Sequence, residues 1–454
     1  MAPRWPKLLK FYPPEGAKSL KRVIYQIVMQ TTEVDVVIIG AGPAGCSAAC
    51  ILAEAGHRVL IVERESFPRY KVGESMIPFT YFPLKRLGLI DKMKSSHFMR
   101  KHSVQFVMPS GKASQPFYFS TRYDADVSQT WQVLRSEFDQ MMLNHALEKG
   151  AQVWQQREVV DMLREDDGRV CGLRVRDPDG VHTEVSATMT IDASGKEAFS
   201  VARNRWRERD PHLNKVAVWT YYKDAKRDPG IDEGATTVAY VPDKGWFWFI
   251  PQHDGMTSVG IVAEASYLTR DGVKQPEAIF KREIAQNKWI ESYLSEGKPV
   301  APYRATSEYT FRSRYCAAPG LLLIGDAFGF LDPVFSSGLL LALKSGVMAG
   351  ETLSQCLKTG DCSPSQFSQY SQEMCEGIEN MRKLVYAFYD PDFSFKDLIA
   401  KYPELGGDVT DCLSGDVNKD FSHLWEKIEE FCAMPESLPY GQPLVEPVPS
   451  ELTA

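Results

Sequence analysis

The chain has 454 residues, enough for a large core and two or three structural units. Its net charge of −7 leaves no basic excess to neutralise phosphates, which disfavours a nucleic-acid-binding protein. No apolar run approaches the roughly 20 residues that cross a bilayer. The nine cysteines are odd in number and form no CxxC pair, which indicates neither a disulfide framework nor a zinc site. We therefore expect a cytoplasmic protein without a metal centre.

The first 30 residues are basic and lack the continuous apolar core of a secretory signal. We expect a flexible tail, and a targeting presequence is the alternative. A single acid, Glu15, stands against Arg4, Lys7, Lys10, Lys18, Lys21 and Arg22.

Residues 34–63 carry the pattern of a dinucleotide-binding βαβ unit. Val36–Ile39 is a β-branched run that predicts a buried strand, and Arg58–Val62 predicts a second one. Between them, Cys46–Ala55 predicts a helix of small residues that ends at Gly56. The glycine-rich turn lies directly after the first strand, as this motif requires.

Each conspicuous residue of the turn has a physical role in that motif. Gly40 permits the tight turn, Gly42 lets the backbone approach a pyrophosphate, and Gly45 lets helix and strand pack closely. Ala44 lies in the turn just before the predicted helix, whose N-terminal N–H groups favour phosphates. Glu63 ends the second strand, where its carboxylate can accept hydrogen bonds from a ribose.

A charged loop follows at residues 64–78. Arg64 begins it, and Arg69, Lys71 and Glu74 lie beside Gly73. Two interpretations stay open, a solvated loop and a segment that contacts the cofactor.

Further elements are predicted up to residue 195. Helical stretches are expected at Tyr81–Leu89 and Trp131–Gly150, with Arg135 at the entrance of the second, where its guanidinium could meet a cofactor phosphate or ribose. Strands are expected at Val104–Met108, Phe117–Phe119, Gln152–Leu163, Val170–Arg176, His182–Ser186 and Met189–Gly195.

Four strand-like segments between residues 216 and 262 predict a larger antiparallel sheet. In Gly245–Pro251, alternation places Trp246, Trp248 and Ile250 on one side and the two phenylalanines on the other. A doubly buried aromatic strand is the simplest interpretation of that segment alone. The other strands are Val216–Tyr222, Thr236–Pro242 and Thr257–Val262, and a surface helix is expected at Gln275–Leu294.

The segment that starts at residue 321 repeats the pattern of the first predicted strand and its glycine turn. A buried strand at Leu321–Ile324 runs into Gly325 and Asp326, and the Asp326 carboxylate can bond the ribityl hydroxyls of a flavin. A helix is expected at Leu339–Leu353, with Ser336 or Ser337 as its N-cap. Residues 364–389 are predicted to be mostly helical, and the proline-rich residues 434–454 a disordered or draped tail.

Residues 34–353 resemble the FAD-dependent monooxygenases of the p-hydroxybenzoate hydroxylase type. The resemblance rests on Gly40–Gly45, Arg135, Asp192–Gly195 and the Gly325-Asp326 pair. It implies an α/β fold with a Rossmann-like FAD-binding domain, an inserted antiparallel-sheet substrate domain and a mainly helical C-terminal region. The expected boundaries are 1–30 for the basic tail, 31–205 with 305–360 for the FAD-binding domain, 206–304 for the insertion, 361–433 for the helical region and 434–454 for the tail.

Two further motifs resemble those of flavin-dependent halogenases. Trp246–Pro251 matches the WxWxIP pattern, and Phe330–Gly338 matches FxxPxxSxG. The resemblance implies that Trp246 and Trp248 line the flavin side of the site. The second pattern ends at Gly338 and leads into the helix expected at Leu339–Leu353, whose N-terminal end would attract reduced flavin or halide.

The resemblance also implies the catalytic residues. The segment from Phe98 to Phe106 is similar to the one that bears the family's catalytic lysine, here Lys101, although Ser103 stands where glycine is common. Ser336 is implied as the second catalytic residue. Phe335, implied to line the substrate or halide site, stands where tryptophan halogenases carry glutamate, as in the members that act on phenols and pyrroles.

The expected activity is therefore that of a two-component halogenase. A separate reductase supplies reduced FAD, because no second glycine fingerprint is visible for a nicotinamide cofactor. Chloride or bromide is oxidised through a flavin hydroperoxide to hypohalous acid, which halogenates a phenol or pyrrole, free or tethered to a carrier protein. The alternatives are a monooxygenase or geranylgeranyl-reductase-like enzyme of the same fold, and a flavin-binding protein without turnover.

Overall fold

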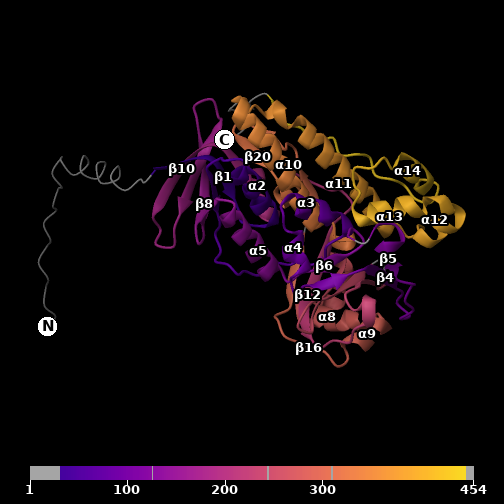
Figure 1. The fold of residues 1–454 in the computed structure, drawn as a ribbon. Helices are drawn as coiled ribbons and strands as arrows, with labels where there is room; N and C mark the ends of the chain where they lie inside the picture. The colour runs from indigo at the N-terminus through magenta and orange to yellow at the C-terminus, as the bar shows by residue number, and fades with distance from the viewer. Residues whose placement is uncertain (1–30, 125, 243–244, 308–309, 446–454) are drawn as a thin grey trace, which may run out of the picture.

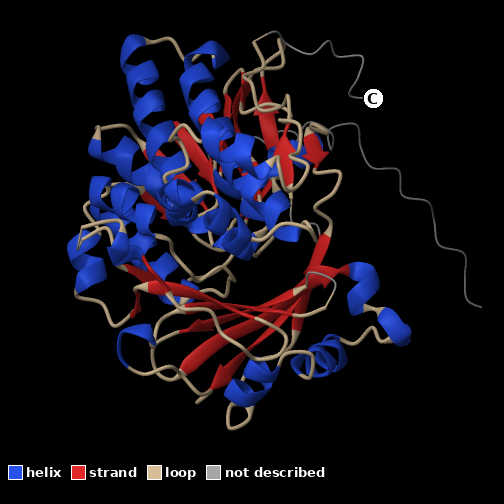
Figure 2. Cartoon of the chain, turned by 90° about the vertical axis from the view of Figure 1, so that its right-hand side faces the viewer, coloured by secondary structure: helices blue, strands red, loops and turns tan. Residues whose placement is uncertain are grey.

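The computed structural model describes residues 31–124, 126–242, 245–307 and 310–445. The basic tail expected at 1–30 lies outside the described residues. Parallel and antiparallel sheets combine with helices, which confirms the predicted α/β class. Figure 2 shows the antiparallel sheet in the lower half of the molecule, below a half that holds most of the helices. Within the described residues, no helix is both long and apolar enough to span a membrane.

The first sheet is organised around the βαβ unit. Its strand order is β19-β20-β10-β1-β2-β7, with β10, β1 and β2 pairing in parallel. The hairpin of β8 and β9 extends from β10. The strands are β1 (Thr31–Ile39), β2 (Val59–Val62), β7 (Gln152–Trp154), β8 (Glu158–Arg164), β9 (Val170–Arg176), β10 (His182–Asp192), β19 (Ala317–Ala318) and β20 (Leu321–Leu323).

Helices pack on this sheet through small residues. Glycines 346 and 350 of α10 lie so close to α2 that a Cβ at Gly346 would approach the Ala44 carbonyl oxygen to 2.4 Å. This contact explains why α2 is composed of alanine, glycine, serine and cysteine along the buried face. The helices of this half include α2 (Pro43–Glu54), α3 (Tyr81–Arg86), α4 (Ile90–Lys94), α5 (Arg135–Glu148), α6 (Phe199–Arg203) and α10 (Gly338–Thr359).

Three predictions for this half were wrong in detail. The segment expected as one strand at Gln152–Leu163 forms two strands, β7 and β8. The helix expected from Trp131 begins at Arg135, because Trp131 lies in β6 (Thr130–Gln132) and pairs with β3 (Met99–Lys101). The two strands expected at 182–186 and 189–195 form the single strand β10, which pairs with β9 at one end and with β1 along most of its length.

The second sheet is largely antiparallel and has the order β16-β12-β15-β14-β13-β4-β5, with β17 also on β12. The side chains of β14 alternate as predicted: its tryptophans belong to one apolar cluster, and Phe247 and Phe249 to the opposite one. The strands are β4 (Ser103–Val107), β5 (Phe117–Tyr118), β12 (Lys215–Lys223), β13 (Thr236–Tyr240), β14 (Trp246–Pro251), β15 (Met256–Glu264), β16 (Lys298–Pro299) and β17 (Arg304–Ser307).

The sheet therefore draws on more of the chain than the predicted insertion at 206–304. Strands β4 and β5 come from residues 103–118, and β4 pairs in parallel with β13. Conversely, β11 (Arg207–Arg209) joins a separate three-stranded sheet with β18 (Phe311–Ser313) and β21 (Gly329–Phe330). The β4–β13 and β11–β18 pairings have no local sequence signal, because each joins segments more than 100 residues apart.

The helix predicted at 275–294 is two helices, α8 (Pro276–Ile284) and α9 (Lys288–Leu294). Asn287 interrupts it, since its side chain accepts hydrogen bonds from the backbone of Trp289 at 3.0 Å and Ile290 at 3.1 Å. Together with α7 (Ala265–Leu268), they cover the face of the second sheet that carries Phe247 and Phe249.

The C-terminal region is helical, with α11 (Ser368–Tyr389), α12 (Phe395–Lys401), α13 (Gly406–Ser414) and α14 (Ser422–Ile428). Figure 1 shows α12, α13 and α14 in yellow at one end, beside β4 and β5. The following segment is draped on the protein: Gly441 donates from its backbone to Arg314, and Leu444 to Ala317. The tail is therefore ordered to residue 445, and the rest of it lies outside the described residues.

Candidate functional site

The turn after β1 has the geometry of a phosphate cradle. Gly40 has φ +98°, and a Cβ there would lie 2.6 Å from the Ala193 carbonyl oxygen. A Cβ at Gly45 would lie 2.1 Å from the Gly40 carbonyl oxygen. In contrast, a Cβ at Gly42 would meet, among the described residues, only Arg69 Nη2, at 3.7 Å. The space in front of the α2 N-terminus is thus open, and its free N–H groups fit a pyrophosphate.

The carboxylate of Glu63 lies beside this turn, at the end of β2. Its Oε2 accepts a hydrogen bond from the Ala41 backbone at 2.9 Å, and its Oε1 accepts one from Glu65. Ala44 packs against Gly325, where an added Cβ would be 2.8 Å from the Ala44 Cβ. Glu63 is therefore held at the carboxyl edge of the sheet, where open α/β sheets bind ligands.

Two arginines share a buried acid at this edge. Arg69 Nη1 donates to Asp139 Oδ2 at 2.9 Å, and Arg135 Nε donates to Asp139 Oδ1 at 2.8 Å. Arg135 also donates to the Gly73 carbonyl oxygen at 3.2 Å, which fixes the start of α5 against the loop. Arg69 Nε is buried without a hydrogen-bond partner among the described residues, although Glu63 lies 3.7 Å away. Its guanidinium faces the cradle and fits a phosphate group.

Asp326 lies where the sequence placed it, in the turn after β20. Burial raises the pKa of its carboxyl to about 6, against the opposing charges of Arg135 and Lys196. Gly325 donates from its backbone to Ser345 Oγ at 2.9 Å, which anchors the turn to α10. A half-buried carboxylate at this edge suits hydrogen bonds from hydroxyl groups.

The loop at 64–78 was expected to be either a solvated loop or a segment that contacts the cofactor, and its two ends differ. Arg64 is about half exposed and pairs with Glu197, and Lys71 pairs with Glu65 at 2.7 Å, as in a solvated loop. Glu74 is 1% exposed and accepts a hydrogen bond from Tyr221 Oη. Burial raises the pKa of the Glu74 carboxyl. The end of the loop therefore belongs to the interior of the protein.

Lys101 is fully buried, at 0% exposure. Its Nζ donates to Ser75 Oγ and to the Met76 carbonyl oxygen, both at 2.9 Å, and lies 5.7 Å from the centre of the Phe119 ring. Burial lowers the pKa of its ammonium to about 7, because the loss of hydration is not offset by a carboxylate of the described residues. Ser103, at the position where glycine is common in the family, donates to Asp232 Oδ1 at 2.8 Å.

Ser75 connects the lysine to further polar groups. Its Oγ lies 3.0 Å from Thr236 Oγ1, which accepts a hydrogen bond from Gln132 Nε2 at 2.8 Å. All three side chains are buried. These three residues could not be predicted as a group, because they lie on three separate segments: Ser75, Thr236 and Gln132.

Both halogenase-like motifs contribute to one aromatic cluster, which contains Trp246, Trp248 and Phe335. Trp246 Nε1 donates to Tyr389 Oη at 2.8 Å, and Tyr389 Oη donates to Asp332 Oδ2 at 3.0 Å. The Phe335 ring packs 5.6 Å from that of Phe388. The motifs are thus joined by hydrogen bonds through the end of α11. Trp246 and Trp248 are 1% and 8% exposed, so the strand is also buried core.

The turn before α10 shows a strained residue. Ser336 has φ +57°, in the left-handed region that non-glycine residues seldom adopt. Ser337 occupies the N-cap position but makes no capping hydrogen bond through its side chain. Gly338 is exposed, and an added Cβ would meet nothing within 4 Å among the described residues. The start of α10 therefore presents an accessible backbone.

Comparisons with known proteins agree with this geometry. The tryptophan halogenase family model matches residues 35–121 and 108–395. A 1H-pyrrole-2-carbonyl-[peptidyl-carrier protein] chlorinase of Pseudomonas fluorescens is 29% identical over 433 residues, covering 90% of this chain and 96% of that protein. The flavin-dependent halogenase armH2 of Armillaria mellea is 31% identical over 361 residues, covering 74% and 68%.

Solved structures give the same result. The flavin-dependent brominase Bmp2 superposes with a TM-score of 0.79 at 26% identity, covering 88% of this chain and 98% of that one. The myxobacterial chondrochloren halogenase CndH superposes with a TM-score of 0.73 at 30% identity, covering 88% and 96%. Fold, family model and relatives therefore agree: this chain belongs to the tryptophan halogenase family and is an FAD-dependent halogenase.

Proposed function

We propose that the enzyme halogenates an electron-rich phenol or pyrrole ring, that a separate reductase supplies its reduced FAD, and that Lys101 holds the hypohalous acid. The buried Lys101, held by Ser75 and the Met76 carbonyl, is the observation that carries the proposal. We also propose a cytoplasmic location, because all nine cysteines are free thiols.

The residues around the cradle suit FAD. The α2 N-terminus at Gly42 and the Arg69 guanidinium would hold the pyrophosphate, and Glu63 would accept from the adenosine ribose. Asp326 and Arg135 would lie toward the ribityl chain. When bound in its reduced form, the cofactor supplies the electrons with which oxygen converts a halide ion into hypohalous acid.

Lys101 then has a defined task in the transfer to the ring. The O–X bond of hypohalous acid breaks, a C–X bond forms, the ring carbon loses its proton, and the hydroxyl leaves as water. A hydrogen bond from the ammonium to the departing oxygen assists that bond cleavage. With a pKa of about 7, Lys101 is also available as an amine, which could form a haloamine with release of water.

The aromatic cluster suits a reaction that must exclude water. Trp246 and Trp248 form part of a dense wall, backed by Trp219, whose ring centre lies 6.3 Å from that of Trp248. Ile77, directly after the carbonyl that binds Lys101, belongs to the same cluster. Free hypohalous acid attacks any nucleophile, so an apolar wall beside the lysine protects it from side reactions.

Phe335 supports the proposed substrate class. The residue is an apolar member of the aromatic cluster, so this position provides no carboxylate to orient an indole ring. Two relatives are named for pyrrole-2-carbonyl groups on a peptidyl carrier protein, a chlorinase and a brominase. A carrier-tethered pyrrole-2-carbonyl group is therefore the first pyrrole to test, beside free phenols.

The test is mass spectrometry of products formed with FAD, a flavin reductase, NADH and either chloride or bromide. The panel contains free phenols, free and carrier-tethered pyrroles, and free tryptophan. We expect halide-dependent products from phenols or pyrroles and little from tryptophan. Oxygenated products that form without halide would favour the monooxygenase, and regioselective halogenation of free tryptophan would refute the proposed substrate class.

A further inference from the structure

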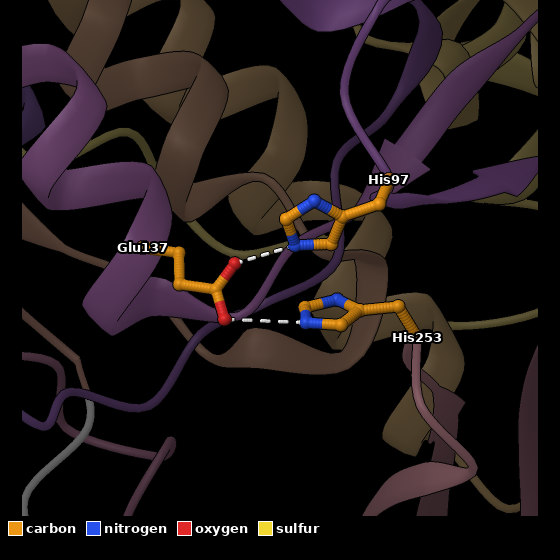
Figure 3. A group of neighbouring side chains, drawn as sticks. All are labelled: His97, Glu137 and His253. Atoms are coloured by element: carbon orange, nitrogen blue, oxygen red, sulfur yellow. Dashed lines mark hydrogen bonds and ion pairs between the residues drawn. The ribbon is translucent and has the colours of Figure 1, made fainter.

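Three side chains of metal-ligating type meet at a place that the proposed reaction does not use. Figure 3 shows His97 and His253 on one side of the Glu137 carboxylate, each directing a ring nitrogen toward a different oxygen. His97 Nε2 lies 2.6 Å from Glu137 Oε2, and His253 Nε2 lies 3.2 Å from Oε1. The three come from different segments: before β3, in the first turn of α5, and after β14.

The spacing is close to that of a metal site. One ligand atom from each residue lies within 4.8 Å of the other two. Tetrahedral zinc with ligand bonds of about 2.0–2.2 Å separates neighbouring ligand atoms by roughly 3.3 Å. The His253–Glu137 distance already has this value, and His97 needs only a small outward movement of an exposed side chain.

The environment of His253 also favours a metal site. The side chain is 92% buried, and its Nδ1 has no hydrogen-bond partner among the described residues. Its polar neighbours on the Nε2 side are Glu137 and, at 3.9 Å, Asp254 Oδ2. Two carboxylates beside this place give it a negative field that attracts a cation. The exposure of His97 leaves room for water to complete the coordination.

We propose that His97, Glu137 and His253 bind a divalent transition-metal ion, with zinc as the first candidate. Two imidazoles and a carboxylate form a ligand set that zinc uses when water occupies the remaining position, and Co²⁺ and Ni²⁺ accept the same donors. No metal motif reveals the site, since 40 and 116 residues separate Glu137 from the two histidines.

The position suggests a structural role for the ion. His97 lies four residues before Lys101, and Glu137 lies two residues after Arg135. His253 follows the strand that carries both tryptophans. A bound ion would therefore connect the lysine strand, the cofactor-binding helix and the aromatic strand. This proposal concerns metal binding alone and does not depend on the halogenation reaction.

The test uses full-length, tag-free protein treated with a chelator and titrated with Zn²⁺ alone. We expect one ion per chain by elemental analysis and a higher melting temperature with zinc, because the ion binds the folded state. With Co²⁺, visible absorption bands should report nitrogen and oxygen ligation. No bound ion in the wild-type protein would overturn the proposal.

Variants locate the site. His97→Gln changes an exposed side chain, so the fold should persist, as circular dichroism would verify. It should weaken zinc binding more than about a hundredfold, since losing an outer-shell partner alone costs roughly 10- to 100-fold. Glu137→Gln should weaken zinc binding to a similar extent. His182 is an exposed histidine on β10, so His182→Gln serves as the control and should bind zinc as tightly as the wild type. Equal affinity of wild type and His97→Gln would assign the ion to another place and refute the proposal.

Discussion

Lys101 Nζ lies 2.9 Å from Ser75 Oγ, although 26 residues separate the two along the chain. The serine lies near the end of the charged loop that follows the dinucleotide fingerprint, and the lysine ends strand β3. This contact joins the cofactor-binding unit to the proposed catalytic lysine in one buried arrangement. A change at either residue should therefore affect the chemistry more than the binding of FAD.

Replacement of Lys101 by alanine should separate the flavin reaction from halogenation. FAD affinity and flavin reoxidation should remain nearly intact, because oxygen reacts at the flavin ring. Halogenated product should fall at least about a hundredfold, the lower end of what a positioned proton donor contributes. Arginine at this position keeps the charge and tests whether the amine form matters. An alanine variant with normal product yield would remove Lys101 from the mechanism.

Ser75→Ala should shift the pH profile of halogenation. A hydrogen-bond acceptor favours the ammonium form of Lys101, so its loss should lower the pKa of the lysine below about 7. The inflection in product formation near neutral pH should then move to lower pH, whichever form is active. The measurement is initial rate against pH with saturating reduced FAD. A lower rate with an unmoved inflection would indicate a purely structural role for Ser75.

The βαβ unit and the aromatic strand were predictable because their signals are local. Glycines 40, 42 and 45 follow a short apolar run, and the alternation of Trp246 with Phe247 has the period of a strand. The same holds for Asp326, which lies one residue beyond the glycine that ends a buried strand.

The remaining features depend on contacts between distant segments. Trp131 continues an amphipathic helical pattern, yet pairing with Arg100 places it in a strand. Arg69 lies in a loop with no periodicity, and only the folded chain brings its guanidinium to Gly42. Asn287 is different: an asparagine is a common helix cap, so its sequence signal was present and the helix break could have been predicted.

Burial of Lys101 should leave a signature in the pH dependence of stability. Its pKa falls from 10.5 in the unfolded chain to about 7 in the folded one, so the unfolded state binds more protons between these values. The contribution of Lys101 therefore destabilises the fold most below pH 7, and stability rises with pH up to about 10. Lys101→Met should flatten this slope, as denaturant unfolding at several pH values would measure. Parallel slopes for the two proteins would indicate that the lysine is hydrated.

Gly42→Val should abolish FAD binding without unfolding the protein. Gly42 has φ −73°, which valine tolerates, and within the described part of the chain an added Cβ would have only an ordinary contact with Arg69, at 3.7 Å. The side chain would instead fill the path of the pyrophosphate. Gly406→Val is the matched control. Gly406 lies in α13, and among the described residues a Cβ there would meet only Ile399, at 4.0 Å. Flavin fluorescence titration should show binding by the control and none by Gly42→Val, at similar melting temperatures.

Tyr389→Phe should weaken the connection between the two halogenase motifs. The phenol accepts a hydrogen bond from Trp246 Nε1 and donates one to Asp332. Burial raises the pKa of the Asp332 carboxyl to about 6, while the hydrogen bond from Tyr389 acts to lower it. Without the phenol both groups lose a buried partner, which should cost about 1–3 kcal/mol of stability. The pKa of Asp332 should rise further, so the loss of stability relative to wild type should be larger at pH 8 than at pH 5, where the carboxyl is protonated.

If the tryptophan wall confines hypohalous acid, the Tyr389→Phe variant should also form less halogenated product per flavin oxidised. An unchanged ratio of product to flavin turnover, together with the expected loss of stability, would show that the hydrogen bonds serve the fold alone.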